Sequence, residues 1–230
     1  MGFYDELAIY YDEIFPFNED KYQFLRSRVE QGQVLDLGCA TGAYATRLSE
    51  EDTLFVKGID LNEDMIRLAE QRVGSASFEV GDMRELNEKN RYELIYSIGN
   101  TIVHLDDYEE IKDTVKSMLD SLTKSGKLVI QIVNYARVFR QAVSELPLIE
   151  TRNVKFHRYY QHKNGKLLFK SVLKTKLNKL VSEVLLYPLT KDELDMIAKE
   201  LNANIRFYGS FKEEPYKQDS FHLIAVLDKS

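Results

Sequence analysis

The sequence predicts an α/β protein with a doubly wound, mostly parallel seven-stranded sheet and an antiparallel β insertion before the last helix. Three observations predict it. Apolar strand-like runs alternate with helical patterns up to Val133, which is typical of parallel strands joined by crossover helices. Strand-like alternation without helices follows over residues 150–188. A capped helix and two more strand-like runs end the chain.

Composition sets the broad class. With 230 residues, 44% of them hydrophobic, residues 1–230 are expected to form one domain with one substantial core. Charged residues make up 30%, and the net charge of −6 favours solubility. Cys39 is the only cysteine, which excludes an intramolecular disulfide and favours a reducing compartment. No apolar run approaches about 18 residues and the N-terminus lacks a signal-peptide pattern, so we expect a cytoplasmic protein without a membrane span.

The first elements are helical. Residues 4–14 predict a short aromatic helix, and Asn18 predicts the cap of a second helix that ends near Gly32. Five apolar strand-like runs follow: Gln33–Leu37, Leu54–Ile59, Ser77–Val80, Tyr92–Ser97 and Lys127–Val133.

Helical patterns separate several of these runs. One follows Gly42, and another extends from about Asp107 to Leu122. A third starts at Asn62 and stops at Gly74, with one apolar face made of Met65, Ile66, Ala69 and Val73. This alternation predicts helices on both faces of the sheet.

The insertion and the last elements have clear local signals. Asn164-Gly165 is the strongest short hairpin signal in the chain, between strand-like segments of the insertion. Thr190 and Glu193 match a capping box for a helix that extends to about Leu201. The segments of the insertion and the two last strands are Val154–Tyr160, Leu167–Leu177, Lys179–Tyr187, Ala203–Phe211 and Ser220–Leu227.

The segment V-L-D-L-G-C-A-T-G places Gly38 and Gly42 where the first strand turns into a helix. Glycines let a backbone approach a ligand closely. A tight turn without a ligand would use the same residues, so this motif alone is weak evidence for a binding site.

Three further motifs strengthen the evidence for a binding site. Asp60 ends the second run and can accept both ribose hydroxyls; Asp82, before Met83, can hold an adenine amino group; and Ile98-Gly99-Asn100 follows the fourth run. Each also has a plain structural interpretation, as a helix cap, a turn residue and a loop respectively. All three follow carboxyl ends of predicted strands, where open α/β sheets bind ligands.

The character of the turn favours one ligand over another. A dinucleotide site requires G-x-G-x-x-G, but this spacing gives Gly38, Ala40 and Ala43. Asp36 would repel a pyrophosphate, whereas it suits an ammonium group. S-adenosylmethionine carries an ammonium and a sulfonium and no phosphate, and nearby tyrosines attract cations. A nicotinamide-dependent oxidoreductase is the alternative.

These motifs carry a family resemblance. V-L-D-L-G-C-A-T-G, G-I-D-L-N-E-D-M, G-D-M and G-K-L-V-I resemble the successive motifs of class I S-adenosylmethionine-dependent methyltransferases. L-A-I-Y-Y-D, S-I-G-N-T-I-V-H-L and V-I-Q-I-V-N-Y resemble the glycine/sarcosine N-methyltransferase-like branch. The resemblance implies the Rossmann-like fold of that class, from about residue 4 to the C-terminus.

The resemblance also implies roles for individual residues. His104, Tyr11 and Asn100 match positions beside the reacting groups, although His104 could be a loop histidine and Tyr11 a core aromatic. Val133 stands where the family has the arginine that grips glycine's carboxylate, which argues against glycine as acceptor. The implied cofactor-binding residues are Tyr11, Asp36, Gly38, Ala40 (usually glycine), Gly42, Asp60, Leu61, Asp82, Met83, Ile98 and His104.

The expected function is methyl transfer from S-adenosylmethionine to a small-molecule acceptor, with an amine nitrogen as the leading candidate. Such an in-line displacement depends on positioning and needs no covalent nucleophile. His104 is the candidate proton acceptor. No metal-ligand spacing is visible, and no proline-proline-aromatic signature for DNA methylation follows Ser97. A catalytically silent S-adenosylmethionine-binding protein is another alternative.

One charge pattern lies outside the family resemblance. From Thr151 to Ser182 there are nine basic residues and no acidic one. A solvated hairpin face would explain this pattern. An anionic substrate over the site or docking in a homodimer are the functional alternatives, and contact with nucleic acid is the least favoured because the rest of the chain is acidic.

Overall fold

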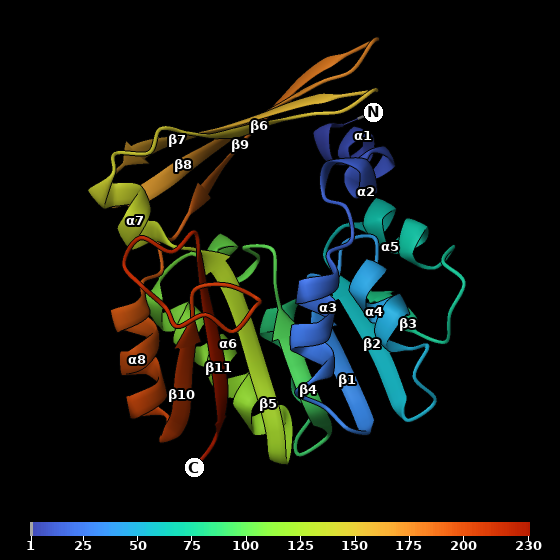
Figure 1. Cartoon of the computed structure of the whole chain (residues 1–230), viewed down its shortest axis with the longest axis vertical. Coiled ribbons are helices and arrows are strands. Elements are labelled where there is room, and N and C mark those ends of the chain that lie inside the picture. The colour runs from blue at the N-terminus through green and yellow to red at the C-terminus, as the bar shows by residue number, and fades with distance from the viewer. Residues whose placement is uncertain (1) are drawn as a thin grey trace.

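The computed structural model describes residues 2–230 and contains the predicted seven-stranded sheet (Figure 1). The strand order is β10-β11-β5-β4-β1-β2-β3. The five strands β1 to β5 are parallel, β11 pairs antiparallel with β5, and β10 pairs antiparallel with β11. The strand order reverses between β1 and β4, because β2 and β3 lie to one side of β1 and β4 and β5 to the other, so a ligand is expected at the carboxyl ends of these two strands.

The elements have the following bounds. The strands of this sheet are β1 Gly32–Leu37, β2 Leu54–Asp60, β3 Ser77–Val80, β4 Tyr92–Ser97, β5 Leu122–Val133, β10 Ala203–Tyr208 and β11 His222–Lys229. The α-helices are α1 Phe3–Ile9, α2 Tyr11–Ile14, α3 Glu19–Arg26, α4 Ala43–Leu48, α5 Glu63–Ala69, α6 Tyr108–Ser121, α7 Tyr135–Arg140 and α8 Lys191–Glu200. Two short 3₁₀ turns are η1 Met83–Glu85 and η2 Ile102–His104.

Side chains that alternate along the strands are buried under helices on both faces of the sheet. On β1, Leu35 and Leu37 pack with α6 and α8 on one face, while Val34 packs with α3 and α4 on the other. The predicted helix starts at Asn18, Asn62 and Asp107 are confirmed, because each side chain accepts a backbone N–H three residues later. The capping box of Thr190 and Glu193 is also confirmed. No helix in the described part of the chain is long and apolar enough to cross a membrane.

Three predicted helix boundaries were wrong. The 4–14 helix is interrupted at Tyr10, and the helix capped by Asn18 ends at Arg26, six residues before Gly32 begins β1. The helix after Asn62 ends at Ala69, and Val73 is 95% exposed. Beyond the helix, the Ser75 hydroxyl donates to the carbonyl of Ser49, the residue that follows α4, at 2.7 Å, and this bond holds the segment before β3 against α4.

The insertion is a second, antiparallel sheet in the order β6-β7-β8-β9, and it lies above the carboxyl ends of the main strands (Figure 1). Its predicted start at residue 150 was wrong, because β6 begins at Glu145; Pro147 and a shift in register after Leu146 hide that strand's alternation. The predicted hairpin at Asn164-Gly165 is confirmed, with both residues at positive φ. Its bounds are β6 Glu145–Glu150, β7 Lys155–Lys163, β8 Lys166–Lys174 and β9 Lys179–Leu186.

Candidate functional site

The turn after β1 is built on three residues with positive φ. Gly38, Ala40 and Gly42 have φ values of +79°, +48° and +74°. A Cβ at Gly42 would lie 2.5 Å from a ring carbon of Phe78, and one at Gly38 would collide with Thr101. Packing and backbone conformation therefore both require glycine at these two positions, and the turn brings its backbone to the carboxyl end of the sheet.

Ala40 is the one non-glycine residue at positive φ in this turn, a conformation that costs an L-residue roughly 1–2 kcal/mol. We expect Ala40→Gly to raise the free energy of unfolding by up to about 1 kcal/mol, since greater freedom of glycine in the unfolded chain offsets part of the gain. Urea denaturation measures this effect. Ala43→Gly, inside α4, is the control and should destabilise; a loss of stability in Ala40→Gly would contradict the prediction.

Asp60 joins the second strand to this turn. Its Oδ2 accepts the Ala40 N–H and its Oδ1 accepts the Asn62 N–H, both at 2.9 Å. The cap of α5 is Asn62, whose side chain accepts the Met65 N–H, so Asp60 does not fill the helix-cap role. Asp60 is half-buried, and burial raises the pKa of its carboxyl while these backbone bonds lower it.

Asp36 lies just before the turn and is 3% exposed. Burial raises the pKa of its carboxyl to about 8, and the nearby Asp60 carboxylate raises it as well. A buried carboxyl of this kind favours a cationic partner and disfavours a phosphate. The preference of this turn for a cationic ligand stays a prediction.

Tyr11 and His104 lie near these carboxylates. Burial raises the pKa of Tyr11, and Asp60 and Asp36 raise it further, in that order. The surrounding protein lowers the pKa of His104 by desolvation, whereas Asp60 opposes that effect. The His104 side chain is nevertheless exposed to solvent. The structure thus brings Tyr11, Asp36 and His104 within electrostatic reach of Asp60, and we call Tyr11, Asp36, Asp60 and His104 the acidic cluster.

Three apolar residues were predicted beside the cofactor. Leu61 is 67% exposed next to Asp60, Met83 is half-buried at the start of η1, and Ile98 is 8% exposed after β4. A leucine as exposed as Leu61 leaves apolar area that a flat ring could cover.

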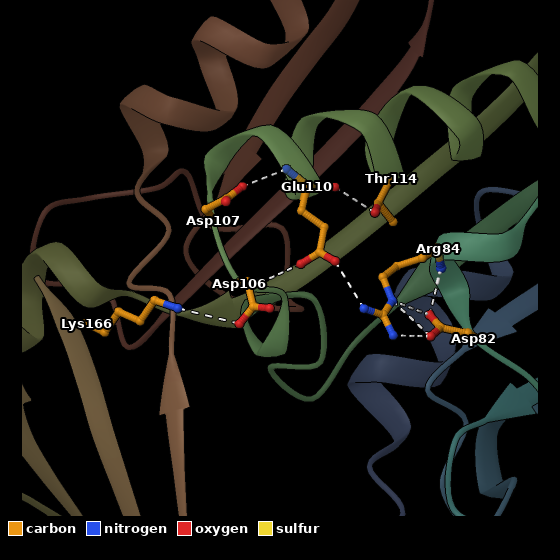
Figure 2. Close-up of polar contacts among 7 residues, drawn as sticks. All are labelled: Asp82, Arg84, Asp106, Asp107, Glu110, Thr114 and Lys166. Carbon is orange, nitrogen blue, oxygen red and sulfur yellow. Dashed lines mark hydrogen bonds and ion pairs between the residues drawn. The ribbon is translucent and has the colours of Figure 1, made fainter.

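Asp82 is engaged by its own neighbour. Figure 2 shows the Arg84 guanidinium between the carboxylates of Asp82 and Glu110. Arg84 Nε lies 3.0 and 2.9 Å from the two Asp82 oxygens, and Arg84 Nη1 lies 3.1 Å from Glu110 Oε1. Arg84 lowers the pKa of Asp82, chiefly through these hydrogen bonds. Asp82 also caps η1 through the Arg84 N–H, so its structural interpretation as a turn residue holds, and an adenine amino group would have to share the Asp82 oxygens with Arg84.

Asn100 is held by structural bonds. Its Nδ2 donates to the Tyr135 hydroxyl at 2.8 Å, and its Oδ1 accepts the Val133 N–H at 3.0 Å. These bonds fix the end of β5 and the start of α7 next to the loop after β4. Gln131 supports the same loop, because its Oε1 accepts the Gly99 N–H at 2.8 Å.

The sequence analysis missed Gln131 and Tyr135. The signal for Gln131 was a single polar residue inside the apolar run V-I-Q-I-V. In the described part of the chain, no group of three or more His, Cys, Asp or Glu side chains could hold a metal ion.

Comparisons with known proteins find similarity to methyltransferases. Residues 34–126 match the family model described as a methyltransferase domain. A 115-residue segment is 30% identical to dTDP-3-amino-3,4,6-trideoxy-alpha-D-glucopyranose N,N-dimethyltransferase of Streptomyces venezuelae, covering 49% of this chain and 47% of that protein. A 202-residue segment is 29% identical to phosphoethanolamine N-methyltransferase 1 of Arabidopsis thaliana, covering 83% of this chain and 38% of that protein.

A solved structure extends the similarity to the whole fold. The S-adenosylmethionine-dependent methyltransferase from Clostridium acetobutylicum superposes with a TM-score of 0.84 at 15% identity, over 99% of each chain. The aligned segments span about half the length of the first curated relatives, 55% and 47%. The main sheet, the turn and the insertion therefore belong to one known architecture.

Proposed function

We propose that this chain, a class I S-adenosylmethionine-dependent methyltransferase by its matched domain and its fold, methylates the amine nitrogen of a small anionic acceptor. The observation that carries the proposal is the acidic cluster beside the glycine turn. A cofactor with an ammonium and a sulfonium suits it because a cation favours the ionised form of the buried Asp36, whereas a pyrophosphate would oppose that ionisation.

The residues of the cluster have separate roles in this proposal. Bound S-adenosylmethionine supplies an activated methyl group. Asp60, at the end of β2, accepts hydrogen bonds from the ribose hydroxyls. Asp36 faces the ammonium, and the Tyr11 ring lies near the sulfonium, where an aromatic face stabilises a cation.

His104 is proposed to take a proton from the acceptor. Desolvation lowers the pKa of His104, which favours the neutral imidazole, and the free ring nitrogen of that form can accept a proton from the acceptor. Its exposed side chain faces solvent from η2, where an acceptor can reach it. Asn100 acts as a positioning residue, through its bonds to Val133 and Tyr135.

The acceptor class rests on two observations. The two N-methyltransferase relatives named above have acceptors that, by name, combine an amine with a phosphate or diphosphate. In addition, Val133 is a buried apolar residue and supplies no guanidinium for the carboxylate of glycine. A phosphate or carboxylate farther from the nitrogen fits both observations.

Turnover on a panel of amines tests this proposal. We expect release of S-adenosylhomocysteine to be at least about tenfold faster, per unit of enzyme and acceptor, with phosphoethanolamine or a dTDP-amino sugar than with glycine. Faster turnover of glycine, or a preference for neutral amines such as ethanolamine, would contradict the anionic-acceptor proposal.

Calorimetry separates the alternatives. Binding of S-adenosylmethionine without methyl transfer to any acceptor would point to a silent binding protein. Micromolar binding of NADH would point to an oxidoreductase and would overturn the interpretation of Asp36.

A further inference from the structure

The two faces of the insertion differ sharply in charge. On β7, Phe156 and Tyr160 are buried, so their neighbour Arg158, two residues from each, lies on the same face of the strand. The paired residues Leu173, Ser171 and Phe169 of β8 continue this inner face. The strand lysines occupy the alternate positions, on the outer face: Lys155, Lys163, Lys170, Lys174 and Lys179.

Several lysines of the insertion are paired with carboxylates. Lys170 pairs with Glu183 at 2.8 Å and Lys155 pairs with Glu150 at 2.7 Å, both on the outer face. Lys166, at the hairpin end of β8, reaches Asp106 at 3.6 Å (Figure 2). The solvated-face interpretation therefore holds for most of the basic window, and Arg158 is its exception.

The inner face packs against the rest of the protein at two places. At one end, Phe156 and Leu173 pack with α1, α2 and α5 through Leu7, Ile14 and Met65. At the other end, Tyr160 packs with the core that contains Tyr135, at a ring-centroid distance of 6.2 Å. Arg158 lies between these two anchors along β7. The sheet that contains β7 lies above the carboxyl ends of the main strands (Figure 1).

Arg158 is a cation without a carboxylate partner within residues 2–230. Its Nη2 donates to the Pro147 carbonyl at 2.8 Å, while its Nε is covered and has no hydrogen-bond partner. On the same two strands, Lys155, Lys166 and Lys170 each pair with a carboxylate, and Lys163 and Lys174 are exposed to solvent. Burial lowers the pKa of Arg158, which is the direction expected of a cation held away from water without a counter-charge.

Arg158 also lies in a polar band across an otherwise apolar face. Register places it beside Ser171 of β8, which in turn lies beside Ser182 of β9. Apolar and aromatic rows flank this band, formed by Phe156, Leu173 and Leu180 on one side and by Tyr160, Phe169 and Val184 on the other. A guanidinium followed by two hydroxyls is a donor set suited to a phosphate.

We propose that Arg158 binds the phosphate or carboxylate of the methyl acceptor, and so sets the class of acceptor as amines whose anionic group lies away from the nitrogen. This inference rests on the proposed function. A chain of aromatic contacts links Arg158 to the acidic cluster: Arg158 lies 5.6 Å from the Phe156 ring, Phe156 5.9 Å from Phe15, and Phe15 5.1 Å from Tyr11.

Binding of O-phosphoethanolamine to the full chain loaded with S-adenosylhomocysteine tests the proposal directly. Calorimetry compares the wild type with Arg158→Gln, Arg158→Lys and the control Lys170→Gln, which removes the same charge from the outer face of the same hairpin. Ethanolamine is the neutral probe, and thermal unfolding checks the fold of each variant. We expect Arg158→Gln to weaken phosphoethanolamine binding about 10- to 100-fold, with binding of ethanolamine and S-adenosylhomocysteine unchanged.

Lys170→Gln is expected to change affinity less than about threefold, and Arg158→Lys to fall between the wild type and Arg158→Gln because it keeps the charge without the two-pronged geometry. Equal effects of Arg158→Gln and Lys170→Gln, or no phosphoethanolamine binding by the wild type, would overturn the inference. If Arg158→Gln does not fold, wild-type affinity in Arg158→Lys would overturn it too.

The assay also separates this inference from the proposed function. Arg158-dependent binding without any S-adenosylhomocysteine formed from S-adenosylmethionine would leave the anion site standing and would refute amine methylation of this acceptor. Turnover of phosphoethanolamine that is unchanged in Arg158→Gln would refute the anion site and would leave amine methylation of this acceptor standing.

Discussion

Asp60→Ala should weaken binding of S-adenosylhomocysteine about 30- to 150-fold, corresponding to about 2–3 kcal/mol. Two effects combine. The variant leaves the ribose hydroxyls without a charged acceptor, and it removes the acceptor for the Ala40 and Asn62 N–H groups, which hold the turn against β2. The turn itself is therefore expected to loosen, so the loss should exceed that of a single ligand hydrogen bond.

Titration calorimetry measures this effect, and two further variants separate its parts. Asp60→Asn keeps one side-chain oxygen, so it should retain one backbone bond and lose about half of the binding free-energy difference. Asp64→Ala removes a nearby carboxylate on α5 that pairs with Arg67, and it should leave affinity within about twofold of the wild type. Wild-type affinity in Asp60→Ala would exclude Asp60 from the cofactor site.

Local signals account for the parts of the fold that the sequence predicted well. For most strands, the predicted first and last residues lie within a few residues of the observed ones, because each strand is an apolar run flanked by turn residues. The caps at Asn18, Asn62, Asp107 and Thr190 were found because the side chain and its N–H partner are three residues apart. Helix ends without such a signal, such as Arg26, were placed too late.

Long-range contacts account for what the sequence could not predict. Asn100 matched a family position beside the reacting groups, but its bonds to Val133 and Tyr135 join residues more than thirty positions apart. The Asp82–Arg84 pair is local, whereas its extension to Glu110 depends on how α6 packs beside η1.

The basic segment from Thr151 to Ser182 also shows that long-range packing could not be predicted from the sequence. Nine cations in one segment suggested a basic cover for the site. The period of two in β7 places Arg158 with Phe156 and Tyr160, but only the packing of those two aromatic residues shows which face of the sheet is the inner one. Composition therefore overstated the number of cations near the site, and the structure reduces the inner-face candidates to Arg158.

The second large effect concerns pH. Burial raises the pKa of Asp36 to about 8 in the ligand-free protein, far above the ordinary value of an exposed aspartate. A group whose pKa is raised on folding stabilises the protein fully below its unfolded pKa and loses that contribution as the pH rises through the folded pKa. Ligand-free protein should therefore lose stability between about pH 4 and 8. Asp36→Asn, which cannot ionise, should remove this part of the pH dependence and raise the melting temperature at pH 8.

Cofactor binding should show the opposite preference, because the ammonium group favours the ionised form of Asp36. Affinity for S-adenosylmethionine is expected to rise between pH 6 and 8, by up to about tenfold per pH unit, with release of up to one proton on binding. Asp36→Asn should bind about 10- to 100-fold more weakly at pH 8 and should release less of that proton. Calorimetry in buffers of different ionisation enthalpy measures both quantities, and Asp52→Asn, at an exposed position, is the control. Equal proton release by the wild type and Asp36→Asn would show that another group takes up the charge of the ammonium, and Asp36 would then be a structural acid of the β1 strand.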